Sequence, residues 1–321
     1  MLFMAFSFVS PLFILHASPV LKKASLVTLW QPQAQFAGYY VALDKGFYAK
    51  RGLDLRIIPG VAGRSSEEVL RKGEADFAVL WLATAIRERF SGTRLLNLYQ
   101  FIPGSSLMLV TRKTTGIRRL EDLNMRKVGL WDGTLSILPR FLFKKFDIRV
   151  REVRQSYTVN LFLRGGVDAA SAMWYNEYDV LVQSGIDADE LNVFFLNDYG
   201  VKFPEDGIYA LESTVSKDPA LAKAFLEASL EGWRYAFGHP EECVEIVVRY
   251  MQKAHIPANR AHQKWMLARM HDLALPAAGS LLDGFLKKQD YEEVAHEMLE
   301  AGLIRSFPPY SSFTWRPHEG E

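Results

Sequence analysis

The sequence predicts an α/β protein of two lobes, and three observations lead to this prediction. Patterns typical of strands alternate with patterns typical of helices up to about residue 211, as expected for parallel sheets covered by helices. One strand, helix and strand pattern occurs twice, and the chain after residue 211 reads as helices alone. With 321 residues, of which 49% are hydrophobic and 23% charged, the chain is long enough to bury two cores.

The alternation of elements starts at residue 25. Ser65 and Glu68 have the spacing of a capping box, which places the start of one helix, and the Lys50-Arg51-Gly52 sequence ends another. The elements expected in this stretch are a strand at residues 25–30, a helix at 36–50, a strand at 53–58, a helix at 66–72 and a strand at 76–80.

An internal repeat supports a second sheet of the same kind. Asp54 lies in one predicted strand and Asp76 opens the next, and Asp147 and Asp168 recur at nearly the same separation. The strand and helix signals around these residues repeat in the same order. Each lobe is therefore expected to contain one strand, helix and strand unit of this type.

The last part of the chain predicts helices. Asp218 caps a helix that begins at Pro219, and its buried face is expected to carry Ala222, Phe225, Ser229, Trp233 and Phe237. Further helices are expected after Pro240, Asn259 and Leu281, followed by an irregular tail at residues 308–321.

The chain is expected to pass directly from one lobe to the other at two places, because no low-complexity linker separates the lobes. We expect short crossing strands at residues 108–111 and 208–211. Lobe 1 then comprises residues 25–108 and 212–321, and lobe 2 comprises residues 109–211.

The N-terminus predicts export. Residues 2–15 form an apolar run that is too short to span a bilayer, and Ala17 offers a small residue for cleavage, so residues 1–18 are interpreted as a signal peptide. No Lys or Arg precedes the run, which leaves a misassigned start as the alternative. The only cysteine, Cys243, lies far from the cleavage point, so it cannot be a lipoprotein anchor, and we expect it to be buried. A free periplasmic protein is the expected result.

The charge balance excludes partners that are attracted by a global field. Lys and Arg number 38 and Asp and Glu 37, a net charge of +1, so neither nucleic acid nor an anionic membrane is expected as a partner. Aromatic residues make up 13% of the chain and include seven Trp. They fit either an aromatic core or a cleft that holds a planar ligand, and composition does not decide between the two.

Three tryptophans follow predicted strands directly. Ligands of open α/β sheets bind at the carboxyl ends of strands, which is where Trp30, Trp81 and Trp131 fall. Each alone is a common packing residue, but together they predict an aromatic cleft. Phe36 and Tyr39 belong to the helix that opens after Trp30, and we count both as candidate ligand contacts.

Polar candidates follow the predicted strand at residues 168–172. Glu177 can accept hydrogen bonds from an exocyclic amine, and Asn176 can pair with either edge of a heterocycle; Tyr175 precedes them. The alternative is that Asn176 caps a helix whose dipole Glu177 complements. Asp206 stands before the second crossing strand, first as a turn residue and second as a contact. The Gly-Thr-Leu-Ser sequence at 133–136 is a helix cap or a donor of backbone N–H groups.

No metal or catalytic pattern is found in the sequence. His255 and His262 are the closest histidines and lack the spacing of a metal site, and Gly-x-Ser-x-Gly and Walker-type loops are absent. We therefore assign no catalytic residue, no metal and no cofactor.

The sequence contains several motifs that are specific as a set. They are Trp30-Gln31-Pro32, Phe36-Ala37-Gly38-Tyr39-Tyr40-Val41-Ala42, Lys45-Gly46-Phe47-Tyr48, Gly52-Leu53-Asp54-Leu55, Tyr175-Asn176-Glu177, Asn197-Asp198-Tyr199-Gly200 and Pro204-Glu205-Asp206-Gly207. Together they resemble the type II periplasmic solute-binding proteins for alkanesulfonates and thiamine precursors. The resemblance runs from about residue 26 to 211 and is looser beyond. Within this family the sequence most resembles the formylaminopyrimidine-binding proteins, with riboflavin-binding relatives close behind.

The same family contains the thiamine pyrimidine synthase, which uses pyridoxal phosphate on a lysine, a histidine and a cysteine-rich motif. Alignment puts Leu80 at the lysine position and Thr84 at the histidine position, and residues 200–208, which correspond to the cysteine-rich motif, hold no cysteine. The resemblance therefore implies binding without catalysis.

The expected protein is a monomeric periplasmic solute-binding protein of the type II fold. Its two lobes close by a hinge over a small aromatic heterocycle such as a thiamine-pyrimidine precursor, and an ABC permease is its partner. The alternatives are a synthase-like enzyme, a sensor without a transporter, and a binding protein for riboflavin or a sulfonate.

Overall fold

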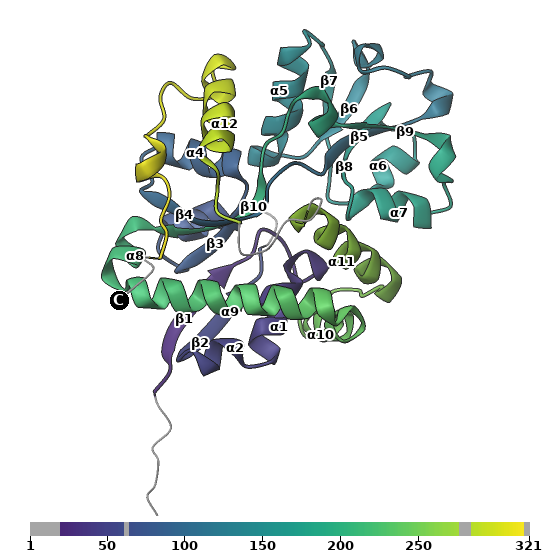
Figure 1. Cartoon of the computed structure of the whole chain (residues 1–321). Helices are drawn as coiled ribbons and strands as arrows, with labels where there is room; N and C mark the ends of the chain where they lie inside the picture. The colour runs from purple at the N-terminus through teal and green to yellow at the C-terminus, as the bar shows by residue number, and fades with distance from the viewer. Residues whose placement is uncertain (1–19, 61–63, 276–283, 318–321) are drawn as a thin grey trace, which may run out of the picture.

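The computed structural model describes residues 20–60, 64–275 and 284–317, and these form two five-stranded sheets with helices around each (Figure 1). The expected signal peptide lies outside the described residues. Within the described ranges, no helix is both long and apolar enough to cross a membrane. The two mixed sheets with flanking helices confirm the predicted α/β fold class.

The first sheet has the order β2-β1-β3-β10-β4. Its strands β1, β2 and β3 run parallel, whereas β10 is antiparallel to both β3 and β4. The strand bounds are β1 Lys22–Val27, β2 Leu53–Ile58, β3 Phe77–Leu80, β4 Leu95–Ile102 and β10 Glu205–Leu211.

The second sheet repeats this wiring with the order β7-β6-β8-β5-β9. Strands β6, β7 and β8 run parallel, and β5 is antiparallel to both β8 and β9. The strand bounds are β5 Leu107–Arg112, β6 Lys127–Leu130, β7 Arg151–Arg154, β8 Ala169–Met173 and β9 Leu191–Phe195.

The internal repeat has a structural reason. Asp76 accepts a hydrogen bond from the backbone N–H of Ser25 at 2.8 Å, and Asp168 accepts one from the backbone N–H of Lys127 at 2.8 Å. In each sheet, the second Asp of the repeat stands just before one parallel strand and binds the backbone of the neighbouring parallel strand. The first Asp residues differ, because Asp54 lies in β2, whereas Asp147 precedes β7 with a positive φ of 50°.

Helices of the first half cover its sheet, and the long helix α9 runs across it beside α1 (Figure 1). The helix expected at residues 36–50 is divided, since Gly46 adopts a φ of 71° between α1 and α2. The bounds are η1 Ala34–Phe36, α1 Ala37–Asp44, α2 Phe47–Lys50, α3 Ser66–Arg71, α4 Leu82–Phe90, α8 Glu212–Lys217, α9 Pro219–Gly238, α10 Pro240–Lys253, α11 Arg260–Ala274 and α12 Lys288–Glu300.

Shorter elements surround the second sheet and complete the chain. Helix α7 follows β8, and Figure 1 shows α11 lying beside it, so a helix of the C-terminal part contacts the second half. The bounds are η2 Lys113–Thr115, η3 Leu120–Leu123, η4 Gly133–Ser136, α5 Ile137–Lys145, α6 Asn160–Leu163, α7 Glu177–Gln183, η5 Ala188–Glu190, η6 Leu196–Tyr199 and η8 Tyr310–Ser312.

Helix starts follow the capping prediction. Ser65 accepts a hydrogen bond from the Glu68 backbone N–H, and Asp218 accepts one from the Leu221 backbone N–H at 3.0 Å. The box at Ser65 is only half formed, because the Glu68 side chain accepts from Lys72 at 2.6 Å. The predicted α9 face is confirmed for Ala222, Phe225, Ser229 and Trp233, which are buried.

The places where the chain crosses between the sheets differ from the expectation. Residues 108–111 lie inside β5 of the second sheet, and residues 208–211 lie inside β10 of the first. The chain passes between the sheets instead at residues 103–106 and 200–204, because η6 at Leu196–Tyr199 still contacts α5 and β5 of the second half and Glu205 already belongs to the first sheet. A strand was predicted at residues 208–211, but β10 begins earlier, at Glu205, so Asp206 lies inside a strand and not in the turn that was expected before it. A strand pattern also does not reveal which sheet the strand joins.

Both crossing segments meet at Glu205, which is fully buried. Its Oε1 accepts hydrogen bonds from Ser105 Oγ at 2.7 Å and from the Ser106 backbone N–H at 2.9 Å, and its Oε2 accepts from Ser106 Oγ at 2.9 Å. Burial, followed by the neighbouring Asp206 charge, raises the pKa of Glu205 to about 8. This carboxyl group joins the first crossing to the end of the second.

Candidate functional site

A small cavity lies in the cleft between the two sheets, at the carboxyl ends of the strands that face it. Its volume is about 80 Å³, whereas about 10–15 Å³ is enough for one water molecule. Ligands of open α/β sheets bind at this edge. Both halves contribute to the wall, which consists of Leu29, Trp30, Gln33, Gln35 and Trp81 from the first half and Trp131, Leu135, Tyr157, Met173, Tyr175, Asn176 and Glu177 from the second.

The three tryptophans that follow strands converge on this cavity. Trp30 follows β1, Trp81 lies between β3 and α4, and Trp131 follows β6. Trp81 and Trp131 are almost fully buried. Flat apolar rings on several sides give the cavity the shape and surface that a planar ligand needs.

A fourth ring, Tyr157, reaches the cavity from the loop after β7. Its centroid lies 4.2 Å from that of Trp30 with an angle of 45° between the planes. Because Trp30 belongs to the first half and Tyr157 to the second, this pair connects the two sides of the cleft. The sequence reasoning missed Tyr157 because strand β7, at Arg151–Arg154, was not located, although Tyr157 follows β7 just as Trp30 follows β1.

Asp206 lies behind the wall and holds two residues of it. Its Oδ2 accepts a hydrogen bond from Gln35 Nε2 at 2.8 Å, and its Oδ1 accepts one from Trp81 Nε1 at 3.2 Å. Gln33 Nε2 in turn donates to Gln35 Oε1 at 2.7 Å. Burial raises the pKa of Asp206 to about 6. Burial and, second, the negative charge of Asp206 raise the pKa of Tyr175 well above its ordinary value. Asp206 thus orients the wall without lining it.

Glu177 lines the cavity at the start of α7 and is only 9% exposed. Its Oε2 accepts a hydrogen bond from the Met173 backbone N–H at 3.0 Å, and its Oε1 accepts one from Asn176 Nδ2 at 2.8 Å. Burial raises its pKa to about 7 against these two contacts, which lower it. The carboxyl group is therefore fixed in place and retains acceptor capacity toward the cavity.

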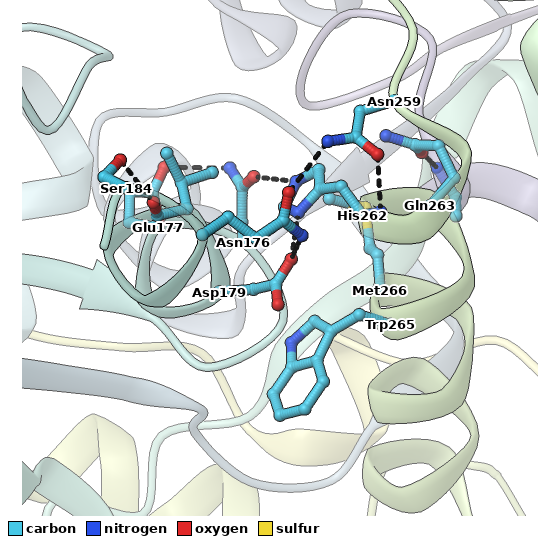
Figure 2. Close-up of polar contacts among 12 residues, drawn as sticks. Asn176, Glu177, Asp179, Ser184, Asn259, His262, Gln263, Trp265 and Met266 are labelled. Carbon is cyan, nitrogen blue, oxygen red and sulfur yellow. Dashed lines mark hydrogen bonds and ion pairs between the residues drawn. The ribbon is translucent and has the colours of Figure 1, made fainter. Parts of the chain in front are cut away.

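Asn176 occupies the N-cap position of α7, but its side chain makes no capping hydrogen bond. Figure 2 shows it between Glu177 and His262 instead, with Oδ1 at 3.0 Å from His262 Nε2. The other ring nitrogen, Nδ1, lies 2.7 Å from Asp179 Oδ2. The capping alternative for Asn176 thus has no support from its contacts, and His262, on α11, joins a network that ends in the cavity.

The same helix, α11, also holds the loop on the opposite side of the cavity. Gln263 Oε1 accepts a hydrogen bond from the Ala34 backbone N–H at 2.7 Å, and Met266 Sδ accepts one from the Gln35 backbone N–H at 3.2 Å. One helix therefore positions wall residues from both halves (Figure 2). Nothing in the periodicity of residues 260–274 indicated this role.

Phe36 and Tyr39 do not line the cavity, contrary to their selection as candidate contacts. Phe36 is fully buried, and Tyr39 packs edge-on against Trp233 with centroids 5.7 Å apart. Both side chains belong to the buried hydrophobic core of the first half instead. At the other candidate segment, Leu135 reaches the wall, while Ser136 Oγ donates to the Gly133 carbonyl oxygen at 2.8 Å.

Three further positions bear on catalysis. Leu80, at the end of β3, and Thr84, in α4, are both buried. Cys243 is buried as expected, and burial raises the pKa of its thiol to about 12. In the part of the chain that the structure covers, no three His, Cys, Asp or Glu side chains are grouped to hold a metal ion.

Comparison with known families matches residues 33–243 to the family described as NMT1/THI5 like. Over 306 residues the chain is 26% identical to a Haemophilus influenzae protein named a thiamine biosynthesis protein, covering 93% of each. It is 24% identical over 261 residues to the riboflavin-binding protein RibY of Chloroflexus aurantiacus, covering 75% of this chain and 70% of that protein. It is 22% identical over 309 residues to the formylaminopyrimidine-binding protein of Halalkalibacterium halodurans, covering 89% and 88%.

Among solved structures, the periplasmic aliphatic sulphonate-binding protein SsuA of Escherichia coli is similar with a TM-score of 0.68. The alignment covers 93% of this chain and 94% of SsuA at 14% identity. This likeness confirms the periplasmic-binding-protein fold that the sequence predicted.

Proposed function

This chain belongs to the NMT1/THI5-like family, and from the geometry of its cleft we propose that it is the extracytoplasmic solute-binding component of an ABC importer. Its ligand is a small aromatic heterocycle with an amine edge, such as a thiamine-pyrimidine precursor. One observation carries this proposal: a cavity between two lobes has aromatic walls and one fixed, buried carboxyl group, Glu177.

The size of the cavity favours a single ring over a larger ligand. A volume of about 80 Å³ leaves space for several water molecules in the closed cleft. A one-ring ligand needs only a small further opening, whereas the three fused rings of riboflavin require much more. The riboflavin-binding relative therefore supports the class of ligand, a flat heterocycle, and the cavity favours its smaller members.

The aromatic rings and the polar groups of the wall have different roles in recognition. The rings supply contact area for any flat ligand, whereas Gln33, Gln35, Asn176 and Glu177 can pair with its edges. Buried polar groups reject analogues that leave them unpaired, so the amides and the carboxyl group supply selectivity.

Transport follows from closure. Wall residues come from both lobes, so a ligand in the cavity contacts both and favours the closed state over the open one. A permease that recognises the closed form receives loaded protein in preference to empty protein. The lobes are joined at the crossing segments 103–106 and 200–204, and we expect hinge motion there.

A binding role is proposed in preference to the pyrimidine-forming reaction of the synthase. The resemblance places that enzyme's reactive lysine at Leu80 and its histidine at Thr84, and neither side chain can supply the amine or imidazole. The name of the Haemophilus influenzae relative, a thiamine biosynthesis protein, is equally consistent with uptake of a thiamine precursor.

Titration calorimetry on the full chain tests the proposal. We expect formylaminopyrimidine or its hydroxymethyl analogue to bind with a Kd of about 1 µM or tighter, and riboflavin to bind much more weakly. Absence of binding by every one-ring ligand would contradict the ligand class. A borohydride-reducible pyridoxal phosphate adduct on a lysine would contradict the binding role.

A further inference from the structure

The Asn176 side chain lies between the His262 imidazole and the Glu177 carboxyl group (Figure 2). Its Oδ1 is 3.0 Å from His262 Nε2, and its Nδ2 is 2.8 Å from Glu177 Oε1. On the other side of the ring, His262 Nδ1 is 2.7 Å from Asp179 Oδ2. One amide therefore connects a carboxyl group of the cavity to an imidazole from another helix.

The orientation of this amide depends on the position of one proton. The Asp179 carboxylate is an acceptor, so His262 carries a proton on Nδ1. With Asn176 Oδ1 toward the ring, Nε2 must carry a proton as well, and Nδ2 donates to Glu177 as a carboxylate. In this arrangement the ring is an imidazolium and Glu177 is charged.

Rotating the amide by half a turn gives a second arrangement. Asn176 Nδ2 then donates to a neutral imidazole, and Oδ1 accepts a hydrogen bond from Glu177 as a carboxylic acid. Both arrangements hold the same number of protons, because the one that leaves His262 Nε2 appears on Glu177 Oε1. A neutral ring together with a Glu177 carboxylate leaves two acceptors facing each other at one contact, which disfavours that state.

We propose that His262 is a positioning residue for ligand choice: by keeping the shared proton, it holds the Asn176 amide in the observed orientation and keeps Glu177 an acceptor. This inference rests on the proposed function. A carboxylate only accepts hydrogen bonds, whereas a carboxylic acid also donates one. The first state therefore favours a ligand with an amine at this edge, and the second favours one with a carbonyl oxygen.

The surroundings of Glu177 show why such a partner matters. Burial opposes its charged form and raises its pKa to about 7, so a carboxylate in the closed cleft needs a compensating cation. Other cations of α11 are engaged at the surface, where Arg260 pairs with Glu245 and Lys264 with Glu241. Arg269 lies over the Trp174 and Trp265 rings. Of the acids of α7, Asp179 contacts the imidazole directly and Glu177 contacts it through Asn176.

A matched control exists one turn further along α11. Trp265 Nε1 donates a hydrogen bond to the Trp174 carbonyl oxygen at 3.1 Å, so it also joins α11 to the second half, but it does not contact Asn176. Substitution of Trp265 by Phe removes this closing contact and retains a ring beneath Arg269. It therefore separates a loss of closure from a loss of amide orientation.

The experiment measures two affinities by titration calorimetry for the full-length wild type and three variants. The ligands are formylaminopyrimidine and the corresponding pyrimidinone, in which a carbonyl oxygen replaces the exocyclic amine of the ring. His262→Leu is expected to lower the preference for the amine-bearing ligand by about tenfold or more. Trp265→Phe is expected to weaken both ligands alike and to leave their ratio within about twofold. His262→Gln restores part of the preference, because its amide can donate to Asn176 Oδ1.

An unchanged ratio in His262→Leu overturns the inference, as does an equal change of ratio in Trp265→Phe. A ligand-free measurement keeps the result independent of the proposed function. We expect the ¹⁵N resonances of the His262 imidazole to differ between Glu177→Gln and the wild type, because the Asn176 amide connects the two groups, and to be unchanged in Glu245→Gln. If the wild type binds neither ligand, the proposed function fails and this spectrum decides the coupling; equal resonances in the wild type and Glu177→Gln overturn it.

Discussion

Each oxygen of Glu177 accepts one hydrogen bond from the protein, one from the Met173 backbone and one from Asn176. A carboxylate has about four acceptor positions, so it keeps capacity for a ligand amine. Because the two protein contacts fix the group, a ligand meets an acceptor that loses little freedom on binding. The rings around it have no such directionality, and we therefore expect selectivity to depend on the Glu177 carboxyl group.

Substitution of Glu177 by Gln is expected to weaken binding of an amine-bearing pyrimidine by about 1–3 kcal/mol, or about ten- to a hundredfold. The amide keeps the shape of the carboxyl group but replaces one acceptor oxygen with a donor. Calorimetry on the variant measures the change, and Glu212→Gln, at an exposed ion pair with Arg94, is the matched control. A change within about twofold for every ligand would mean that Glu177 only starts α7.

The sequence predicted the wall residues that follow strands which were themselves located. Trp30, Trp81 and Trp131 were found because the end of a parallel strand places the next side chains at the ligand edge. Tyr157 was missed because β7, the strand that it follows, was not located at Arg151–Arg154. His262 has no local pattern, since it reaches Asn176 from 86 residues away in the chain through the packing of α11.

At the scale of elements, the packing of α1 against α9 depends on glycine. A Cβ atom at Gly232 would lie 2.1 Å from the Gly38 carbonyl oxygen, so the helices approach nearly to backbone contact there. Gly238, in the last position of α9, has no such neighbour within 4 Å. The two positions allow the cost of close approach to be separated from helix propensity.

Gly232→Ala is therefore expected to destabilise the protein by about 1–3 kcal/mol, since α1 and α9 must move apart. Gly238→Ala is expected to be neutral or to stabilise by up to about 1 kcal/mol, because alanine favours the helix. Urea unfolding measures both. Equal effects of the two substitutions would show that the close contact carries no particular cost.

The crossing segments are the second element whose behaviour can be tested. Ser106 donates to both oxygens of Glu205, through its backbone N–H and its hydroxyl group. Ser106→Ala leaves Glu205 Oε2 without its donor in a buried place and is expected to lower the free energy of unfolding by about 1–3 kcal/mol. Ser216→Ala, at an exposed position of α8, is the control in the same urea titration. No difference between the two variants would argue against a role of Glu205 in joining the crossings.

Sequence reasoning located some parts of the fold and missed others for a physical reason. Strand β2 was expected at residues 53–58 and lies there, because hydrophobic alternation and flanking turns are local signals. The sheet that strand β10 joins was not predicted, since it depends on hydrogen bonds to β3 and β4, which are distant in sequence. The lobe boundary after residue 204 follows from that pairing alone.

At the scale of the whole molecule, three carboxyl groups are buried close to the cleft and the crossings. Burial is the largest cause that raises the pKa of each, to about 7 for Glu177, about 8 for Glu205 and about 6 for Asp206. Surface carboxyl groups behave in the opposite way: the pKa of Asp218 is lowered first by Lys22 and that of Glu242 first by Lys45. The two sets make opposite contributions to the dependence of stability on pH.

The free energy of unfolding of the ligand-free protein is therefore expected to fall as pH rises from about 5 to about 8. The folded state binds protons at Glu205 and Asp206 more tightly than the unfolded chain, whose ordinary pKa values are 4.5 for Glu and 3.8 for Asp. This contribution is complete below the unfolded values and is lost as pH rises through the folded ones. Because one pKa unit corresponds to about 1.4 kcal/mol, a decrease of at least about 2 kcal/mol is expected in urea titrations at the two pH values. Glu205→Gln removes one of the two groups and should make the decrease smaller, whereas a free energy that is constant or rises over this range would contradict buried, proton-binding carboxyl groups beside the cleft.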